Sequence, residues 1–180
     1  MSRVTVSIFI YLAALTDKTC FTNIMKKTLQ LVGAIIGCEL VGISGTVFTV
    51  SAIPAWYALL NKPSFAPPNW LFGPVWTLLY SLMGVSIYLL YQAKGPKKNR
   101  LMAINYFWAQ LAVNFIWTPV FFGLRWPELA LLIIVIMWGL IVQTIRTALP
   151  VNRNSAYLLL PYLAWVSFAT LLNAAIAYLN

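Results

Sequence analysis

The side chains of this 180-residue sequence that could do chemistry are tryptophan, tyrosine and amide groups at helical spacing inside apolar segments. Three segments carry such groups three or four positions apart, so each set shares one helix face. The sets are Trp76, Tyr80 and Gly84; Gln110, Asn114, Trp117 and Phe121; and Tyr162, Trp165, Ala169 and Asn173. Because polar groups in a membrane point away from lipid, we expect the three faces to line an interior cavity. Such a cavity suits a flat, largely apolar ligand with a few polar edges.

The same residues also have a purely structural interpretation. Asn and Gln in a membrane bundle often only join helices by hydrogen bonds, worth about 0.6 kcal/mol each. Tryptophan and tyrosine near the ends of spans often form an interfacial belt. Trp76 and Trp165 favour the ligand interpretation most, because each lies several residues inside its segment with an aromatic neighbour at helical spacing.

Acid–base and metal chemistry find few groups in this sequence. It contains no histidine, and its three acidic residues are Asp17, Glu39 and Glu128. A catalytic triad or a metal site cannot be assembled from these groups, so we expect no metal and no cofactor. Glu39 lies inside an apolar segment without an obvious basic partner, so it is expected to be protonated or to face a polar cavity.

The composition indicates that the cavity-lining faces belong to membrane-spanning helices. Hydrophobic residues make up 62% of the chain and charged residues 8%, whereas soluble domains average about 25% charged residues. A span needs about 20 mostly apolar residues. Five segments qualify, at residues 29–53, 70–91, 101–122, 126–149 and 155–179. Their short connections predict an all-α polytopic membrane protein, an up-and-down bundle of five transmembrane helices.

The five spans define one membrane domain at residues 29–180, preceded by an extension at residues 1–28 that we expect to be loosely ordered. The apolar run at residues 4–15 is too short to span a bilayer and could be the core of a signal peptide. Met25 is followed by two lysines directly before the first span and looks like a natural start. No function is assigned to the extension.

The distribution of basic residues predicts the orientation in the membrane. The net charge is +9, but the charges lie between apolar segments rather than on a water-facing surface, so no nucleic-acid partner is expected. Ten of the twelve basic residues fall on one side of the expected topology, and only Lys62 and Arg125 fall on the other. The positive-inside rule then places the N-terminus in the cytoplasm and the loop at residues 54–69 outside. We expect this orientation in the cell membrane.

The loop at residues 54–69 carries four prolines, at positions 54, 63, 67 and 68, among tryptophan, tyrosine and phenylalanine residues. Proline stiffens the backbone and forbids a continued helix. We interpret the loop as a lid over the mouth of the bundle, with an interfacial anchor as the alternative.

Small residues in the first span predict close helix packing. Gly33 and Gly37 lie four positions apart, and Gly42 and Gly45 follow. Such glycines let helix backbones approach each other within a bundle or between subunits. A homodimer is therefore expected.

The loop and the second, third and fifth spans closely resemble the translocator protein family, whose members are also called tryptophan-rich sensory proteins or peripheral-type benzodiazepine receptors. The resemblance covers the chain from about residue 29 to its end. The matching residues in the loop and second span are Trp56-Tyr57, Leu60, Lys62-Pro63, Phe65, Pro67-Pro68, Phe72, Val75-Trp76, Leu79-Tyr80 and Gly84. The third and fifth spans add Gln110-Leu111, Asn114-Phe115, Trp117, Pro161-Tyr162-Leu163-Ala164-Trp165, Phe168-Ala169 and Leu172-Asn173.

The resemblance implies a five-helix bundle, commonly dimeric, with a pocket under the first loop that binds porphyrins such as protoporphyrin IX. Trp76 and Trp165 match the pocket tryptophans linked to light-dependent porphyrin breakdown, and Ala169 matches an alanine whose replacement by threonine alters ligand affinity in relatives. Combined with the helical faces, the expected ligand-binding residues are Tyr57, Pro67, Trp76, Asn114, Trp117, Tyr162, Trp165 and Ala169.

The leading hypothesis is a membrane receptor or regulator that binds a porphyrin-type tetrapyrrole, with a role in tetrapyrrole transport or stress signalling. Its partners are then a porphyrin or another apolar small molecule, and membrane lipid. The first alternative is a light-dependent enzyme that degrades bound porphyrin, with Trp76 and Trp165 as catalytic electron partners, because acid–base catalysis lacks the groups it needs. The second is a lipid or sterol transporter. No basic residue follows Tyr162 as the family's sterol pattern requires, and only residues 89–94 fit a looser pattern.

Overall fold

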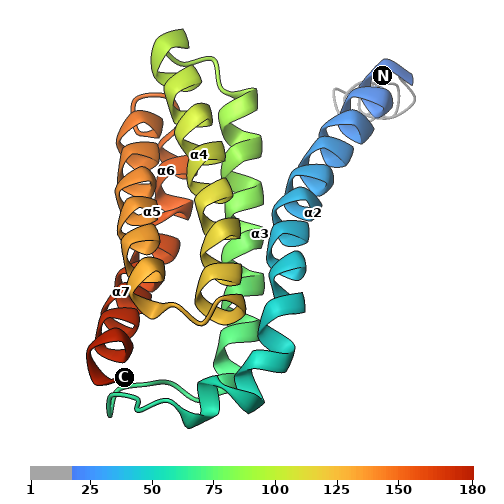
Figure 1. The fold of residues 1–180 in the computed structure, drawn as a ribbon. Helices are drawn as coiled ribbons and strands as arrows, with labels where there is room; N and C mark the ends of the chain where they lie inside the picture. The colour runs from blue at the N-terminus through green and yellow to red at the C-terminus, as the bar shows by residue number, and fades with distance from the viewer. Residues whose placement is uncertain (1–17) are drawn as a thin grey trace, which may run out of the picture.

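The computed structural model describes residues 18–180, and every regular element in that part of the chain is helical (Figure 1). The long helices are α2 (Lys18–Ala55), α3 (Phe72–Gln92), α4 (Lys97–Thr118), α5 (Pro127–Ala148) and α7 (Leu160–Leu179), with the short α6 (Arg153–Leu158) directly before α7. The prediction of an all-α bundle is confirmed.

The helices pack both against neighbours in the sequence and against helices further along the chain. The closest pairs are α4 with α5, α2 with α3, α5 with α7, and α3 with α6. The N-terminal half of α2 leans away from the bundle, and its C-terminal half lies against the other helices (Figure 1). The loop after α2 crosses the end of the bundle where the C-terminus also lies (Figure 1). This end is called the loop end below.

Four helical segments of the described chain are long and apolar enough to cross a membrane. They are Phe21–Ala55, Asn69–Gln92, Pro127–Ala148 and Arg153–Leu179. The expected third span, α4, is less apolar because it contains amide side chains such as Gln110 and Asn114, but both of these are buried inside the bundle. The arrangement supports a multi-pass membrane protein.

The first helix begins earlier than the expected span. The expected span starts at residue 29, whereas α2 begins at Lys18. The segment from Lys18 to Thr28 contains no proline or glycine, so nothing in it interrupts the helix. Residues 1–17, which include the apolar run at residues 4–15, lie outside the described part of the chain.

Prolines explain where the other helices change geometry. Pro161 has no backbone N–H to donate to residue 157, so the expected fifth span is divided into α6 and α7 at Leu159. After α4, Pro119 opens the π-helical turn η3 (Pro119–Gly123), in which the Leu124 N–H donates to the Pro119 carbonyl at 2.8 Å. This wider turn brings Phe121 and Phe122 against the loop.

The glycines of α2 divide into two pairs. A Cβ at Gly42 would overlap the ring of Tyr80, and a Cβ at Gly45 would lie 3.2 Å from Thr118, so both glycines permit close packing within the bundle. A Cβ at Gly33 or Gly37 would meet no other atom of the described chain within 4 Å. Of these four glycines, Gly33 and Gly37 are therefore the pair that is free to pack against another molecule.

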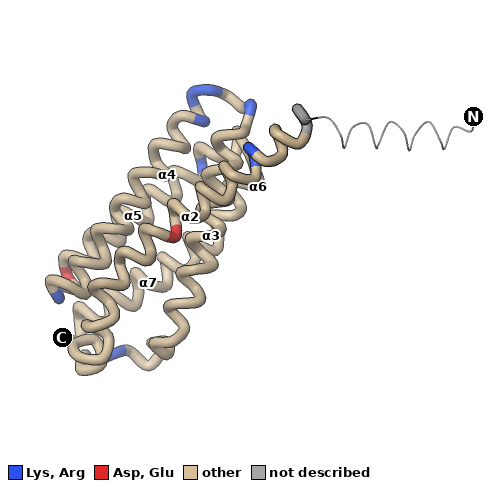
Figure 2. The backbone as a smooth tube through the Cα atoms, turned by 90° about the vertical axis from the view of Figure 1, so that its right-hand side faces the viewer, with Lys and Arg blue, Asp and Glu red and all other residues tan. Residues whose placement is uncertain are grey.

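The charged residues gather at the two ends of the bundle (Figure 2). Lys62 and Arg125 lie at the loop end. The eight other described basic residues with a placed side chain lie at the opposite end and are Lys26, Lys27, Lys94, Lys97, Lys98, Arg100, Arg146 and Arg153. Glu39 lies near the middle of α2, away from both of these ends.

Candidate ligand-binding cavity

A cavity of about 320 Å³ lies between α2, α3, α4 and α7 at the loop end of the bundle. This volume is at the lower end of the range for small-molecule sites, about 300–1,000 Å³. The helix residues that line it are Glu39, Gly42, Ile43, Gly45, Thr46, Thr49, Ile53, Phe72, Gly73, Trp76, Thr77, Tyr80, Asn114, Trp117, Thr118, Phe121, Phe122, Trp165, Ala169, Leu172, Asn173 and Ile176. Tyr57 and Asn69 from the loop complete the lining.

The structure brings most of the expected ligand-binding residues to this cavity. Those that line it are Tyr57, Trp76, Asn114, Trp117, Trp165 and Ala169. Pro67 is not among the lining residues and is half-buried in the loop. Tyr162 is not among them either; it is fully buried and lies against Trp76, with ring centroids 6.3 Å apart.

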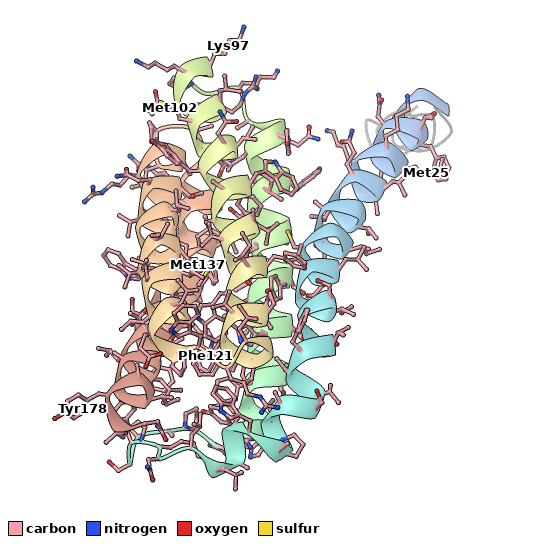
Figure 3. All side chains as sticks on the ribbon, viewed as in Figure 1. Met25, Lys97, Met102, Phe121, Met137 and Tyr178 are labelled. Carbon is pink, nitrogen blue, oxygen red and sulfur yellow. The ribbon has the colours of Figure 1, made fainter. Side chains whose placement is uncertain are left out.

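A chain of buried hydrogen bonds closes the cavity on the side away from the loop. The Tyr80 hydroxyl donates to Asn114 Oδ1 at 2.7 Å, and Asn114 Nδ2 donates to the Tyr162 hydroxyl at 2.9 Å. The Tyr162 hydroxyl in turn lies 2.9 Å from Gln110 Oε1, to which it donates. These four side chains are called the floor. In Figure 3, Phe121 lies at the loop end of the bundle and Met137, whose sulfur is 3.4 Å from the Tyr162 hydroxyl, lies further from the loop.

The floor explains which members of the three predicted helix faces reach the cavity. On each face the residue furthest from the loop fails to line it, namely Gly84, Gln110 and Tyr162. All other members of the three faces line it. Helical spacing therefore identified the correct sides of the helices, and the floor sets the depth.

Eight of the 24 lining residues carry aromatic rings. Trp117 stacks on Phe121 with ring centroids 5.0 Å apart and an interplanar angle of 20°. Trp76 lies 5.4 Å from Tyr80 at 30°. Flat rings of this kind offer their faces and edges to another flat aromatic molecule.

The loop packs on the helices through the rings of Tyr57, which lines the cavity, and Phe65, which is half exposed and does not line it. Tyr57 is 4% exposed and lies 5.9 Å from Phe122, and Phe65 lies 6.2 Å from Phe168 of α7. By contrast, Trp70 is 71% exposed and faces outward. The inner side of the loop has the contacts of a lid, while the outer side offers an aromatic group to the membrane interface.

Two sets of polar contacts hold the loop in place. The Asn61 backbone N–H donates to Asn180 Oδ1 at 2.9 Å, and Asn180 Nδ2 donates back to the Asn61 carbonyl at 3.0 Å. The Lys62 ammonium donates to three loop carbonyls, the nearest being that of Tyr57 at 2.9 Å. The reciprocal Asn61–Asn180 contact, called the latch, joins the loop to the C-terminal end of α7.

Two hydrogen-bond donors of lining residues lack a partner in the described part of the chain. They are the Tyr57 hydroxyl and the Trp165 indole Nε1, both buried. Burial raises the pKa of Tyr57 above its ordinary value, so the hydroxyl keeps its proton and remains a donor. Because buried polar groups in folded proteins are nearly always paired, these two donors stand out among the polar groups of the lining residues.

Glu39 supplies the charged group of the lining. The structure places its side chain on the cavity wall, where the Ser81 hydroxyl donates to Glu39 Oε1 at 2.8 Å. A carboxyl group at this depth in a membrane span faces a cavity rather than lipid, as expected for an intramembrane acid.

Apart from Glu39, the residues of α2 that line the cavity were not predicted from the sequence. Gly42, Gly45, Thr46 and Thr49 all line the cavity. Gly42, Thr46 and Thr49 follow one another at steps of four and three, the spacing of one helix face. This pattern of small and hydroxyl residues was the available signal.

The chain matches known proteins over most of its length. The TspO/MBR family model matches residues 34–179. The chain is 42% identical over 154 residues to the "Tryptophan-rich protein TspO" of Archaeoglobus fulgidus, an alignment that covers 84% of this chain and 97% of the relative. It is 41% identical over 119 residues to the human "Translocator protein", covering 66% and 70% of the two chains. It is 38% identical over 125 residues to the "Tryptophan-rich sensory protein" of Cereibacter sphaeroides, covering 69% and 77%. The chain therefore belongs to the TspO/MBR family.

Proposed function

We propose that this membrane protein is a receptor or regulator that binds a porphyrin-type tetrapyrrole in the cavity beneath the loop. The observation that carries the proposal is the lining: Trp76, Trp117 and Trp165 all line one hollow, and the Trp165 N–H has no partner among residues 18–180. Flat aromatic walls suit a macrocycle, and an unpaired indole donor suits an acceptor at the edge of the macrocycle.

The size of the cavity adds a requirement to the proposal. A volume of about 320 Å³ is small for a whole tetrapyrrole. The loop must therefore move outward, or part of the macrocycle must project from the cavity. The latch and the ring contacts of Tyr57 are the contacts that such a movement changes.

Titration of protoporphyrin IX with purified protein in a neutral detergent tests the proposal. Porphyrin absorbance and fluorescence are followed, because these signals remain available when tryptophans are replaced. We expect saturable binding that weakens at least tenfold in the Trp76→Phe, Trp165→Phe double variant, since each replacement removes an indole from the wall.

The matched control is the Trp108→Phe, Trp138→Phe double variant. Both of these tryptophans are exposed on the outside of the bundle, 47% and 40% respectively, and neither lines the cavity. Unsaturable binding to the native protein, or equal losses in the two double variants, would contradict the proposal.

Light-dependent breakdown of the bound porphyrin is a second candidate function. It is favoured by the position of Trp76 and Trp165 on the wall of the same cavity, where both indoles could exchange electrons with a bound macrocycle. Illumination of the complex in air should then produce a new bilin-like absorbance that the double variant does not form. Bleaching at the rate of free porphyrin would leave binding as the function.

We also propose a cytoplasmic N-terminus in the cell membrane and a homodimer. The orientation is supported by eight basic residues with placed side chains at the end opposite the loop, against two at the loop end. Single cysteines at Lys62 and Lys97 in a variant without the native cysteines should label from opposite sides of intact cells.

The dimer is supported by the free face at Gly33 and Gly37. Gly37→Leu should shift the purified protein to monomer, and an unchanged mass would count against this interface.

A further inference from the structure

We propose that Glu39 makes the deep end of the cavity a recognition site for a protonated amine, so that the protein accepts flat aromatic cations as ligands. The proposal rests on the proposed function in one respect, namely that the cavity takes a ligand. It goes beyond that function in naming a second chemical class and the residue that selects it.

Glu39 stands apart from the other polar groups of the lining. Among the lining residues, all of which lie in the described chain, it is the only one with a formal charge. Its only hydrogen bond that the structure records is the one accepted from Ser81, at Oε1. A carboxylate can accept several hydrogen bonds through its two oxygens, so capacity remains for a donor inside the cavity.

The lining threonines Thr46, Thr49 and Thr77 carry neutral hydroxyls, which are weaker acceptors for a cation than a carboxylate, and each donates its own proton to its helix. The Thr46 and Thr49 hydroxyls donate to the carbonyls of Ile43 and Thr46, at 2.6 and 3.3 Å. The Thr77 hydroxyl donates to the Gly73 carbonyl at 3.1 Å. A ligand that reaches this part of the cavity therefore meets one strong acceptor, which is the carboxyl group of Glu39.

The polar groups of the cavity are sorted by depth. Ser81, which holds Glu39, lies nine residues further along α3 than Phe72, which corresponds to about 13 Å of helix rise. Phe72 contacts Trp165, with ring centroids 5.9 Å apart, and the Tyr57 hydroxyl lies in the loop segment. The unpaired donors thus lie toward the loop, and the acidic acceptor lies deep.

This polarity predicts how ligands of opposite charge behave. A cation held near the carboxylate away from bulk water interacts more strongly than it would in water, because the effective dielectric is lower. The same carboxylate repels the propionate groups of a porphyrin. These groups should therefore face the loop end of the cavity, toward the donors of Tyr57 and Trp165. Removal of the charge should weaken the cation and either leave or strengthen porphyrin binding.

The test compares two flat probes of nearly equal shape in neutral-detergent micelles at mildly alkaline pH. The probes are 9-aminoacridine, which is a cation under these conditions, and acridine, which is neutral. We expect native protein to bind 9-aminoacridine at least tenfold more tightly than acridine, the size of a charge-assisted hydrogen bond. Glu39→Gln, which keeps the shape and the contact with Ser81, should abolish this preference without changing the affinity for acridine.

The matched control is Glu128→Gln, which removes the same charge from the first turn of α5, away from the lining. Its preference for 9-aminoacridine should equal that of the native protein. No preference in the native protein, an unchanged preference in Glu39→Gln, or an equal loss in Glu128→Gln would each overturn the inference.

Protoporphyrin IX is titrated into the same preparations to separate the two proposals. Saturable porphyrin binding without a Glu39-dependent acridine preference overturns the inference alone. A Glu39-dependent preference without porphyrin binding overturns the proposed tetrapyrrole ligand alone. Porphyrin affinity that falls tenfold in Glu39→Gln would contradict the predicted polarity of the cavity.

Discussion

Ser81 and Ser86 lie five positions apart on α3 but in very different surroundings. Ser86 is fully buried against Ser155 of α6, which is also fully buried. Each hydroxyl lies 2.9 Å from the backbone carbonyl of the other serine and 2.9 Å from its hydroxyl. Ser81, nearer the loop, bonds to Glu39 on the wall of a hollow. The region around Ser86 and Ser155 is called the packed end, and the region between the floor and the loop is called the cavity end.

The two ends differ in whether their buried polar groups are paired, and this difference assigns stability to one end and ligand binding to the other. At the packed end, Ser86 and Ser155 satisfy each other, and large side chains such as Phe107 and Leu90 are fully buried around them. At the cavity end, the donors of Tyr57 and Trp165 have no partner in the described chain. Changes at the packed end should therefore reduce the free energy of unfolding, and changes at the cavity end should reduce ligand affinity.

The largest effect is expected where α2 and α3 touch just beyond the cavity end. A Cβ at Gly84 would overlap the backbone of Ile35, which cannot move aside as a side chain can. Gly84→Val should lower the free energy of unfolding by about 3 kcal/mol, the upper range for overpacking. Thermal unfolding in detergent measures it. Gly139→Val is the control, because a Cβ there meets no atom of another described element within 4 Å, and equal losses in both variants would contradict this account.

The next effect tests the packed end itself. Ser155→Ala removes a fully buried hydroxyl that donates to the Ser86 carbonyl and lies 2.9 Å from the Ser86 hydroxyl. The Ser86 hydroxyl keeps the Ser155 backbone carbonyl as its acceptor, so the loss should be about 1.5 kcal/mol of stability. Protoporphyrin IX affinity should not change. The Ser86→Ala, Ser155→Ala double variant should lose less than the sum of the two single losses, because the hydroxyls depend on each other. Additive losses would show that the two serines act separately.

At the cavity end, the same logic predicts lost affinity with little lost stability. Trp165→Phe keeps an aromatic ring and removes the buried unpaired N–H. Its affinity for protoporphyrin IX should fall about tenfold, and its melting temperature should stay close to that of the native protein. Trp108→Phe is the control, because the Trp108 N–H bonds to Tyr91 outside the cavity. A stability loss without an affinity loss in Trp165→Phe would place that residue with the packed end.

The smallest effect concerns the latch. Asn180→Ala removes the reciprocal bonds to the exposed Asn61, which are worth about 0.5–1 kcal/mol. The porphyrin dissociation rate should rise about threefold, because the loop opens more easily. Stopped-flow dilution of the complex measures that rate. Asn154→Ala, an exposed amide change at the opposite end, should leave the rate unchanged, and a slower release from Asn180→Ala would contradict a lid.

Helical periodicity was enough to identify the walls of the cavity but not its depth. The steps between Asn114 and Trp117 and between Trp165 and Ala169 fix the side of a helix, because the α-helix repeats every 3.6 residues. Tyr162 has the same spacing and yet lies in the floor. Its depth follows from how α4 and α7 pack, which no single-helix pattern contains.

Glycine patterns were ambiguous for a related reason. From the sequence alone, the glycines of α2 could serve packing within the bundle or between subunits. Gly42 admits the ring of Tyr80, whereas Gly37 meets nothing in the described chain. A missing Cβ shows only that something can approach closely, and the neighbour that does so is decided by tertiary structure.

The floor has a consequence for any traffic across the membrane. It joins α3, α4 and α7 by buried hydrogen bonds, and the side chains beyond it, such as Phe107 and Ile141, are fully buried. The hollow is thus blind-ended in this conformation: a molecule admitted from the loop side must leave by that side or sideways into the bilayer. Passage to the opposite leaflet would demand that the Tyr80–Asn114–Tyr162 bonds break and the helices part.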